Sequence, residues 1–303
     1  MKKYAILVGI FIIFSSFMIA GAASSSRSAE LISPAVKAEK VLGVNQWYPG
    51  EATAEADAPK VTAKAGFFVD TKNGTVLYSK NIHEKLPIAS LVKVMTALIA
   101  LEHKSMENEF IVSEHAAGME PDKMLLIAGE KLSLKEILSG IFLVSANDGA
   151  EVLAEGTTGD RTEFLNLMNA KAKQLGMKNT YFANPTGLDE DENNSYSTAY
   201  DLAILTRHLI RRYPEVVDIS KTEHIYLPIT ENHQDYDMYS GINLLTTYPG
   251  VVGFKTGYTP EAGLTLITLV QKEGREVVGV LLGSLSRRDE ARELLDYSFK
   301  KLN

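Results

Sequence analysis

Ser90 and Lys93 are the two residues of this sequence whose types and spacing best fit covalent chemistry. They stand at the entrance to the apolar run of residues 91–101, which predicts a buried helix, and residues three apart lie on one face of a helix. A serine hydroxyl needs a base, and a lysine serves as one only when burial or a neighbouring cation destabilises its ammonium. We therefore expect Ser90 to attack and Lys93 to take its proton. The same spacing recurs at Ser298 and Lys301, so the pair alone does not establish the chemistry.

A serine and an asparagine fall between two apolar helical segments, in the triplet Ser145-Ala146-Asn147. A loop at this place would present one hydroxyl and one carboxamide. Acyl transfer uses both groups, with Ser145 relaying a proton and Asn147 holding Lys93 and a substrate amide. Residues 79–81 repeat the pattern at the end of a predicted hairpin, and a helix-capping turn also fits the triplet, so both interpretations stay open.

The triplet Lys255-Thr256-Gly257 occurs once and falls at the end of a predicted strand. A lysine and a threonine on an edge strand bind a carboxylate, and a glycine beside them lets a substrate backbone lie close to the strand. Lys255 would also be the neighbouring cation that destabilises the ammonium of Lys93. A solvated lysine before a strand-end glycine fits the triplet when it is taken alone.

Composition narrows the possible functions. The chain has 303 residues, a formal net charge of −7 at pH 7 and no cysteine. The absence of cysteine excludes disulfides, thiolate metal sites and cysteine nucleophiles. The net negative charge differs from the basic surface that is typical of a nucleic-acid-binding protein. The six histidines show no His-x-x-x-His spacing, so we expect no metal site and no nucleic-acid partner.

The first 23 residues have the features of an export signal. Lys2 and Lys3 precede an apolar run at residues 5–23, whose last part carries the small residues of an Ala-x-Ala cleavage site. The run is also almost long enough to span a bilayer, so residues 1–23 are either a cleaved signal peptide or an N-terminal membrane anchor. Residues 24–60 are rich in Ala, Glu and Ser without a sustained period, which indicates a flexible leader. Both alternatives predict an exported protein.

Residues 61–303 have the pattern of one α+β domain. Strands are predicted near both ends of this region, an Asn-Gly turn closes the first hairpin, and the middle is helical. We expect one antiparallel sheet built from both ends of the domain and covered by helices, with an all-helical inserted lobe and a site in the cleft between the lobes. The predicted strands are residues 66–70, 75–78, 251–256, 264–270 and 277–282, and the predicted helices begin at or just after Ser133, Asp160, Thr198 and Ser286.

Taken together and in this order, the three motifs resemble those of the penicillin-recognising serine D-Ala-D-Ala carboxypeptidases, the low-molecular-mass penicillin-binding proteins. The likeness runs from about Val61 to Leu302 and implies a β-lactamase/transpeptidase-like fold. It extends to segments beyond the triplets, namely residues 86–97, 145–155, 184–188, 196–203 and 253–263.

The resemblance implies a role for each matching position. Ser90 would be the acylated nucleophile and Lys93 its base. The backbone N–H groups of Ser90 and Tyr258 would form the oxyanion hole, and Arg287 matches an arginine near the site for the substrate carboxylate. The other positions that would line the site or hold the substrate are Ser145, Asn147, Lys255, Thr256 and Gly257.

On this likeness the substrate is the pentapeptide stem of peptidoglycan. Ser90 would attack the carbonyl of the penultimate D-Ala, the last D-Ala would leave, and water would release the acyl-enzyme. β-Lactam antibiotics imitate the terminal dipeptide and would leave a slow acyl adduct on the same serine. The resemblance implies no metal and no organic cofactor.

The sequence departs from the family pattern at its end. Many members carry a further β-rich domain and an amphipathic membrane helix after the catalytic part, whereas this chain stops at Asn303. We therefore expect residues 1–23 to be retained as a tether to the extracytoplasmic face of the cell membrane. A mature N-terminus at Ala23 or beyond would contradict this, and the protein would then be secreted to the cell wall.

Three alternatives use the same site. A class A-like β-lactamase needs a loop glutamate for deacylation, and the nearest match, Glu163-Phe164-Leu165-Asn166, is too short and falls in an amphipathic helix. A D,D-endopeptidase differs only in its leaving group. A non-catalytic β-lactam sensor would bind without turnover, although every catalytic position is filled here.

Overall fold

The computed structural model describes residues 48–50, 57–189 and 194–302. The predicted signal or anchor at residues 1–23 and most of the predicted leader lie outside these residues. Within the part of the chain that the structure describes, no helix is both long enough and apolar enough to cross a membrane.

The described part of the leader contacts the folded domain. Gly50 N donates to Gly74 O at 3.3 Å, and the Tyr200 hydroxyl donates to Pro49 O at 3.4 Å. Pro49 is buried by these contacts. Residues 48–50 therefore pack on the domain.

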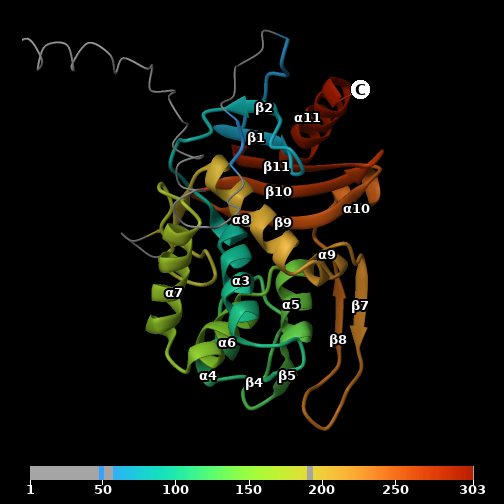
Figure 1. The fold of residues 1–303 in the computed structure, drawn as a ribbon. Coiled ribbons are helices and arrows are strands. Elements are labelled where there is room, and N and C mark those ends of the chain that lie inside the picture. The colour runs from blue at the N-terminus through green and yellow to red at the C-terminus, as the bar shows by residue number, and fades with distance from the viewer. Residues whose placement is uncertain (1–47, 51–56, 190–193, 303) are drawn as a thin grey trace, which may run out of the picture. The chain divides into compact units, whose positions relative to one another are not determined.

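One antiparallel sheet of five strands forms the frame of the domain (Figure 1). Its strands are β1 (Ala65–Asp70), β2 (Val76–Lys80), β9 (Val251–Thr259), β10 (Gly263–Lys272) and β11 (Arg275–Ser284). The strand order is β2-β1-β11-β10-β9, so the first strand pairs with the last one, and Phe67 lies opposite Val280. This confirms the predicted sheet built from both ends of the domain, with β9 at one edge.

Strand β9 is longer than the sequence analysis predicted. The predicted strand ended at Thr256, but pairing with β10 continues to Thr259, which lies opposite Gly263. Lys255 and the two residues after it therefore lie within an edge strand rather than at its end. A glycine inside a strand interrupts the strand pattern, which is why Gly257 was a misleading end signal.

The two faces of the sheet bury different side chains. Phe67 and Phe68 are neighbours in β1, and both are fully buried because successive strand residues point to opposite faces. The Phe68 face packs against the apolar stripe of α11 (Arg287–Leu302). The Phe67 face belongs to the larger core, which contains α3 (Lys93–His103) and α8 (Ala199–Arg212). Helices thus cover both faces, as predicted (Figure 1).

The region between the terminal strands is mainly helical. Besides the helices it holds short antiparallel strand pairs that were not predicted, among them residues 109–111 with residues 131–133 and the hairpin of residues 224–239. Its further helices are α4 (Glu114–Ala117), α5 (Leu134–Leu143), α6 (Asn147–Thr158), α7 (Arg161–Gln174), α9 (Glu215–Ser220) and α10 (Leu244–Thr247), and its short strands are β3 (Leu86–Pro87), β4 (Glu109–Ile111), β5 (Lys131–Ser133), β6 (Tyr196–Ser197), β7 (His224–Leu227) and β8 (Tyr236–Tyr239).

Side-chain caps start the helices where the sequence predicts them. Ser133 Oγ accepts from Glu136 N at 3.3 Å, and the Glu136 carboxylate accepts from Ser133 N at 2.8 Å, which makes a complete capping box for α5. Asp160 caps α7 and Thr198 caps α8 through their side-chain oxygens. These caps fix the starts of three helices in the region between the terminal strands.

Candidate active site

Ser90 lies on a 3-10 turn that leads directly into α3. The turn, η1, spans Ala89–Val92, and Lys93 is the first residue of the helix. In 3-10 geometry residues i and i+3 eclipse each other, so the two side chains meet as the spacing predicted, although the turn is not α-helical. Lys93 Nζ lies 2.9 Å from Ser90 Oγ. Ser90 is partly exposed, whereas Lys93 is fully buried.

The Lys93 amine is surrounded by three acceptors. It donates to Ser90 Oγ, to Asn147 Oδ1 at 2.7 Å and to Thr186 O at 2.6 Å. Burial lowers the pKa of Lys93 well below its ordinary value, and the nearby charge of Lys255 lowers this pKa further. The predicted influence of Lys255 is therefore present, with burial as the larger cause. Three carboxylates oppose the shift, those of Asp122, Asp148 and Glu151.

Ser145 is linked to the lysine of the strand triplet. It lies between α5 and α6 with a φ of 62°, a left-handed conformation that is uncommon for serine. Lys255 Nζ donates to Ser145 Oγ at 2.8 Å and to Thr256 O at 2.7 Å. Lys255 is buried, and burial together with the charge of Arg287 lowers its pKa to about 7. Each of the two predicted hydroxyls thus contacts a buried lysine with a lowered pKa.

The strand triplet packs directly against the Ser90 turn. A Cβ atom on Gly257 would lie 2.9 Å from Ser90 N and 2.6 Å from Thr265 Oγ1, so glycine is what lets β9 approach the turn. The glycine therefore serves the packing of the protein itself, whatever it does for a substrate. Tyr258, next in the strand, is 63% exposed. Arg287 begins α11 and donates to Gly257 O at 2.6 Å, so it contacts the backbone of the triplet.

A backbone carbonyl that was not predicted from the sequence, that of Thr186, is the third acceptor around Lys93. Thr186 O is held by a buried turn in which Asn184 Oδ1 accepts from Gly187 N at 2.6 Å and from Thr186 Oγ1 at 3.0 Å. Gly187 has a φ of 80°, and a Cβ atom there would lie 2.0 Å from Ala89 O. The identity of residue 186 does not indicate this acceptor, because every residue type carries a backbone carbonyl. The signal in the sequence is the asparagine and the glycine of the turn that positions the carbonyl.

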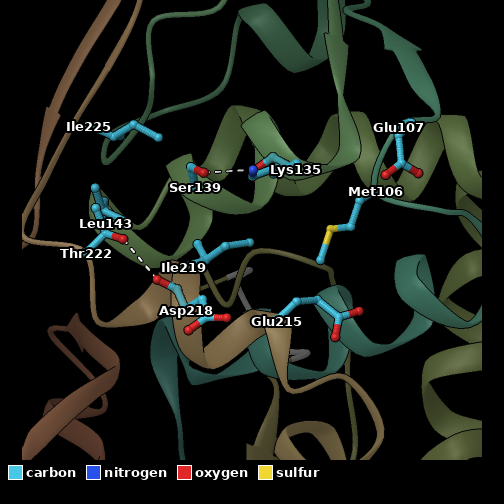
Figure 2. Close-up of a pocket in the computed structure, with 10 residues that line it drawn as sticks. All are labelled: Met106, Glu107, Lys135, Ser139, Leu143, Glu215, Asp218, Ile219, Thr222 and Ile225. Carbon is cyan, nitrogen blue, oxygen red and sulfur yellow. Dashed lines mark hydrogen bonds between the residues drawn. The ribbon is translucent and has the colours of Figure 1, made fainter.

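A separate cavity of about 450 Å³ lies between α5, α9 and the start of β7, and none of the predicted site residues lines it (Figure 2). Its two hydroxyl side chains bond to backbone carbonyls four residues earlier in the chain. Ser139 Oγ donates to Lys135 O at 2.9 Å, and Thr222 Oγ1 donates to Asp218 O at 3.0 Å. Both hydroxyls therefore donate hydrogen bonds to carbonyl groups of their own segments.

Comparison with known proteins gives a family and a fold. The chain matches a family model described as D-alanyl-D-alanine carboxypeptidase over residues 52–286, which include all three motifs. It is 37% identical over 248 residues to the D-alanyl-D-alanine carboxypeptidase DacF of Bacillus subtilis, an alignment that covers 79% of this chain and 62% of DacF. The chain thus spans less than two thirds of the length of that relative.

Two solved structures have the same fold. The D-alanyl-D-alanine carboxypeptidase of Mycobacterium tuberculosis H37Rv is 28% identical with a TM-score of 0.75, over 82% of this chain and 96% of that one. The Streptomyces K15 DD-transpeptidase is 25% identical with a TM-score of 0.75, over 81% of this chain and 100% of that one. The family match extends over most of the chain, and this protein therefore belongs to the peptidase S11 family of D-alanyl-D-alanine carboxypeptidases.

Proposed function

We propose that this chain is a serine D-alanyl-D-alanine carboxypeptidase that removes the terminal D-Ala from the pentapeptide stems of peptidoglycan through an acyl-enzyme on Ser90. The observation that carries the proposal is the 2.9 Å contact between Ser90 Oγ and the buried amine of Lys93. A buried amine whose pKa is lowered is neutral for more of the time at physiological pH. A neutral amine accepts the proton of a serine hydroxyl.

The acceptors around Lys93 direct the proton transfer. A neutral lysine amine has two N–H groups and one lone pair. Asn147 Oδ1 and Thr186 O accept the two N–H groups, which leaves the lone pair for the hydroxyl proton of Ser90. Ser90 Oγ bonds to the carbonyl carbon of the penultimate D-Ala as its proton passes to Lys93 Nζ. The C–N bond to the last D-Ala then breaks as the proton that Lys93 took is relayed through Ser145 to the departing nitrogen, which returns the Lys93 amine to its neutral form. Water then hydrolyses the ester and frees Ser90.

The edge strand β9 supplies the groups that hold the substrate. We assign the terminal carboxylate to Lys255 and Thr256, because Lys255 is a cation at pH values below its pKa of about 7. We assign the oxyanion to the N–H groups of Ser90 and Tyr258, which the packing of Gly257 against Ser90 N supports. A donor of this kind is typically worth about 2.7–4 kcal/mol in the transition state.

The location of the substrate and the chemistry of β-lactams bear on where this protein acts and what inhibits it. Peptidoglycan stems lie outside the cytoplasmic membrane, so we assign export to residues 1–23 and catalysis to residues 61–303 on the extracytoplasmic side. β-Lactams would acylate Ser90 because they present a carbonyl and a carboxylate in the arrangement of the terminal dipeptide.

Release of D-alanine from a diacyl-Lys-D-Ala-D-Ala peptide tests the proposal. The wild-type chain is compared with Ser90→Ala and with Ser298→Ala, a matched control from the other Ser-x-x-Lys sequence, whose hydroxyl donates to Leu294 O within α11. We expect release from the wild type and from Ser298→Ala, and none from Ser90→Ala. Undiminished release from Ser90→Ala would contradict the nucleophile, and a wild type without release would favour an endopeptidase or a sensor.

A further inference from the structure

The segment of residues 119–126 holds Asn147 by two backbone carbonyls. Asn147 Nδ2 donates to Glu120 O at 3.0 Å, and Asn147 N donates to Asp122 O at 2.8 Å. Because Nδ2 is bonded to Glu120, Oδ1 is the side-chain atom that faces Lys93, at 2.7 Å. The reversed amide would place N–H groups against the Lys93 amine. The 119–126 segment therefore determines which end of the carboxamide meets the proposed base.

Asp148 fastens this segment to the first turn of α6. Its carboxylate is fully buried and accepts three backbone N–H groups, from Met124 at 3.0 Å, from Leu126 at 3.1 Å and from Gly149 at 2.8 Å. A buried carboxylate needs partners of this kind, and its position at a helix N-terminus adds favourable dipole interaction. Two of the three N–H groups come from the 119–126 segment. Asp148 thus binds the segment next to the residue that the segment orients.

Packing holds the same segment against α5. The Met124 side chain covers Gly140, where a Cβ atom would lie 2.1 Å from Met124 Sδ and 2.4 Å from Met124 Cγ. Gln234 Nε2 also donates to Leu125 O at 3.0 Å, from the loop between β7 and β8. The segment is therefore tied by a buried carboxylate on one side and by a side chain over a glycine on the other.

We propose that Asp148 is a positioning residue for the reaction at Ser90. By holding residues 119–126 in place, it keeps the carbonyls of Glu120 and Asp122 where they turn the Asn147 carboxamide oxygen toward Lys93. The inference rests on the proposed function, since it assigns Asp148 a role in that same site. A purely structural carboxylate would affect stability alone and would act independently of Asn147.

A double-mutant cycle tests the kinetic part of the proposal. Asp148→Asn keeps the size of the side chain but turns one acceptor oxygen into an N–H donor that faces a backbone N–H. In the full chain we expect kcat/KM for D-alanine release to fall roughly 10- to 100-fold, as for a lost hydrogen bond to a charged group, with KM within about twofold. Asn147→Ala should cause a similar loss, and Asp148→Asn added to it should cost no more than about another twofold. Multiplying losses would overturn the proposal.

Gly140→Ala provides a second variant that leaves the buried charge untouched. The added methyl group would lie 2.1 Å from Met124 Sδ and 2.4 Å from Met124 Cγ, so the Met124 side chain must move and its packing of the segment against α5 is loosened, while alanine itself favours the helix. We expect the same fall in kcat/KM at an unchanged KM. An unchanged kcat/KM in a folded Gly140→Ala variant, with faster amide exchange of residues 119–126, would overturn the role of the segment.

Amide hydrogen exchange gives a readout that does not depend on activity. In both variants the amides of Met124, Leu126 and Asn147 should exchange faster than in the wild type, while the amides of β10 and β11 keep their protection. Unchanged exchange at Asn147 in Asp148→Asn would overturn the proposal. If the wild type releases no D-alanine, the proposed function fails, and the exchange at Asn147 still decides whether Asp148 fastens the segment.

Discussion

Around Ser90, polar groups from segments far apart in the sequence bond to one another, whereas around the cavity of Figure 2 each hydroxyl bonds to its own segment. Lys93 reaches Asn147 and Thr186, which lie 54 and 93 positions further along the chain. In the cavity, Ser139 and Thr222 each bond to the carbonyl four residues earlier. The polar side chains of the Ser90 region therefore have partners that are distant in sequence, whereas the hydroxyls of the cavity have local ones.

The difference shows which buried polar groups are costly to desolvate in this fold. A hydroxyl that bonds to its own helix is satisfied locally at little cost. A buried lysine loses its hydration, and the loss is offset only when several partners converge on it. Strongly perturbed titratable groups of this kind cluster at functional sites. The buried and multiply bonded Lys93 therefore supports the proposal that the reaction takes place at Ser90, whereas the hydroxyls at the cavity of about 450 Å³ are bonded within their own segments.

Replacing one lysine from each region should give the largest contrast. Lys93→Met removes the proposed base, so kcat/KM for D-alanine release should fall roughly 10²- to 10⁴-fold, the range of general-base catalysis. Lys135→Met alters an exposed lysine at the cavity and should leave kcat/KM within about twofold. Steady-state kinetics on both variants check this. Equal losses in the two would remove the distinction between the regions.

The pH dependence should show the two lysines of the site separately. Lys93 must be neutral, so kcat/KM rises as the pH passes its lowered pKa. Lys255 must be charged to hold the carboxylate, so kcat/KM falls again as the pH rises through about 7. A bound carboxylate favours the charged form of Lys255, so the fall in kcat comes at higher pH.

Lys255→Arg is the variant that checks the alkaline limb. A guanidinium stays charged throughout the accessible range, so the fall of kcat/KM above pH 7 should disappear, even if the maximum is lower. Lys135→Met should leave both limbs where they are. An alkaline limb that persists in Lys255→Arg would show that another group causes it.

Asp122→Asn should cause the smallest effect, a shift of the whole pH profile of kcat/KM along the pH axis. The exposed Asp122 carboxylate opposes the lowering of the pKa of both Lys93 and Lys255. Its removal lowers both pKa values further, so both limbs should move to lower pH, by less than about one unit for an exposed charge. Glu107→Gln, at the cavity, should move neither limb. A shift of the limbs to higher pH would contradict the assignment of the two lysines.

The parts of the site that follow a regular spacing were predictable from the sequence. Ser90 and Lys93 are three residues apart, so any helical turn brings them together. The strand pattern placed Lys255 in the last sheet, and the capping box placed the start of α5 at Ser133. Strands at both ends of the domain predicted one sheet built from both ends, although they did not predict the order of its strands.

The remaining parts of the site depend on the paths of loops. Glu120 O and Thr186 O contact Asn147 and Lys93 through backbone atoms, which the identity of a side chain does not signal. The left-handed conformation of Ser145 and, elsewhere in the fold, the pairing of β4 with β5 also follow from tertiary contacts rather than from local pattern. Arg287 was expected near the carboxylate site, and its contact with Gly257 O is visible only once α11 and β9 are placed.

Locating the covalent adduct is the most direct test of the claim that Ser90 is the nucleophile activated by Lys93. The full chain is treated with benzylpenicillin, and the modified residue is identified by peptide mapping with mass spectrometry. The account predicts one adduct per chain, on Ser90, and no adduct in Lys93→Met over the same time. An adduct on Ser145, or equally fast labelling of Lys93→Met, would contradict it.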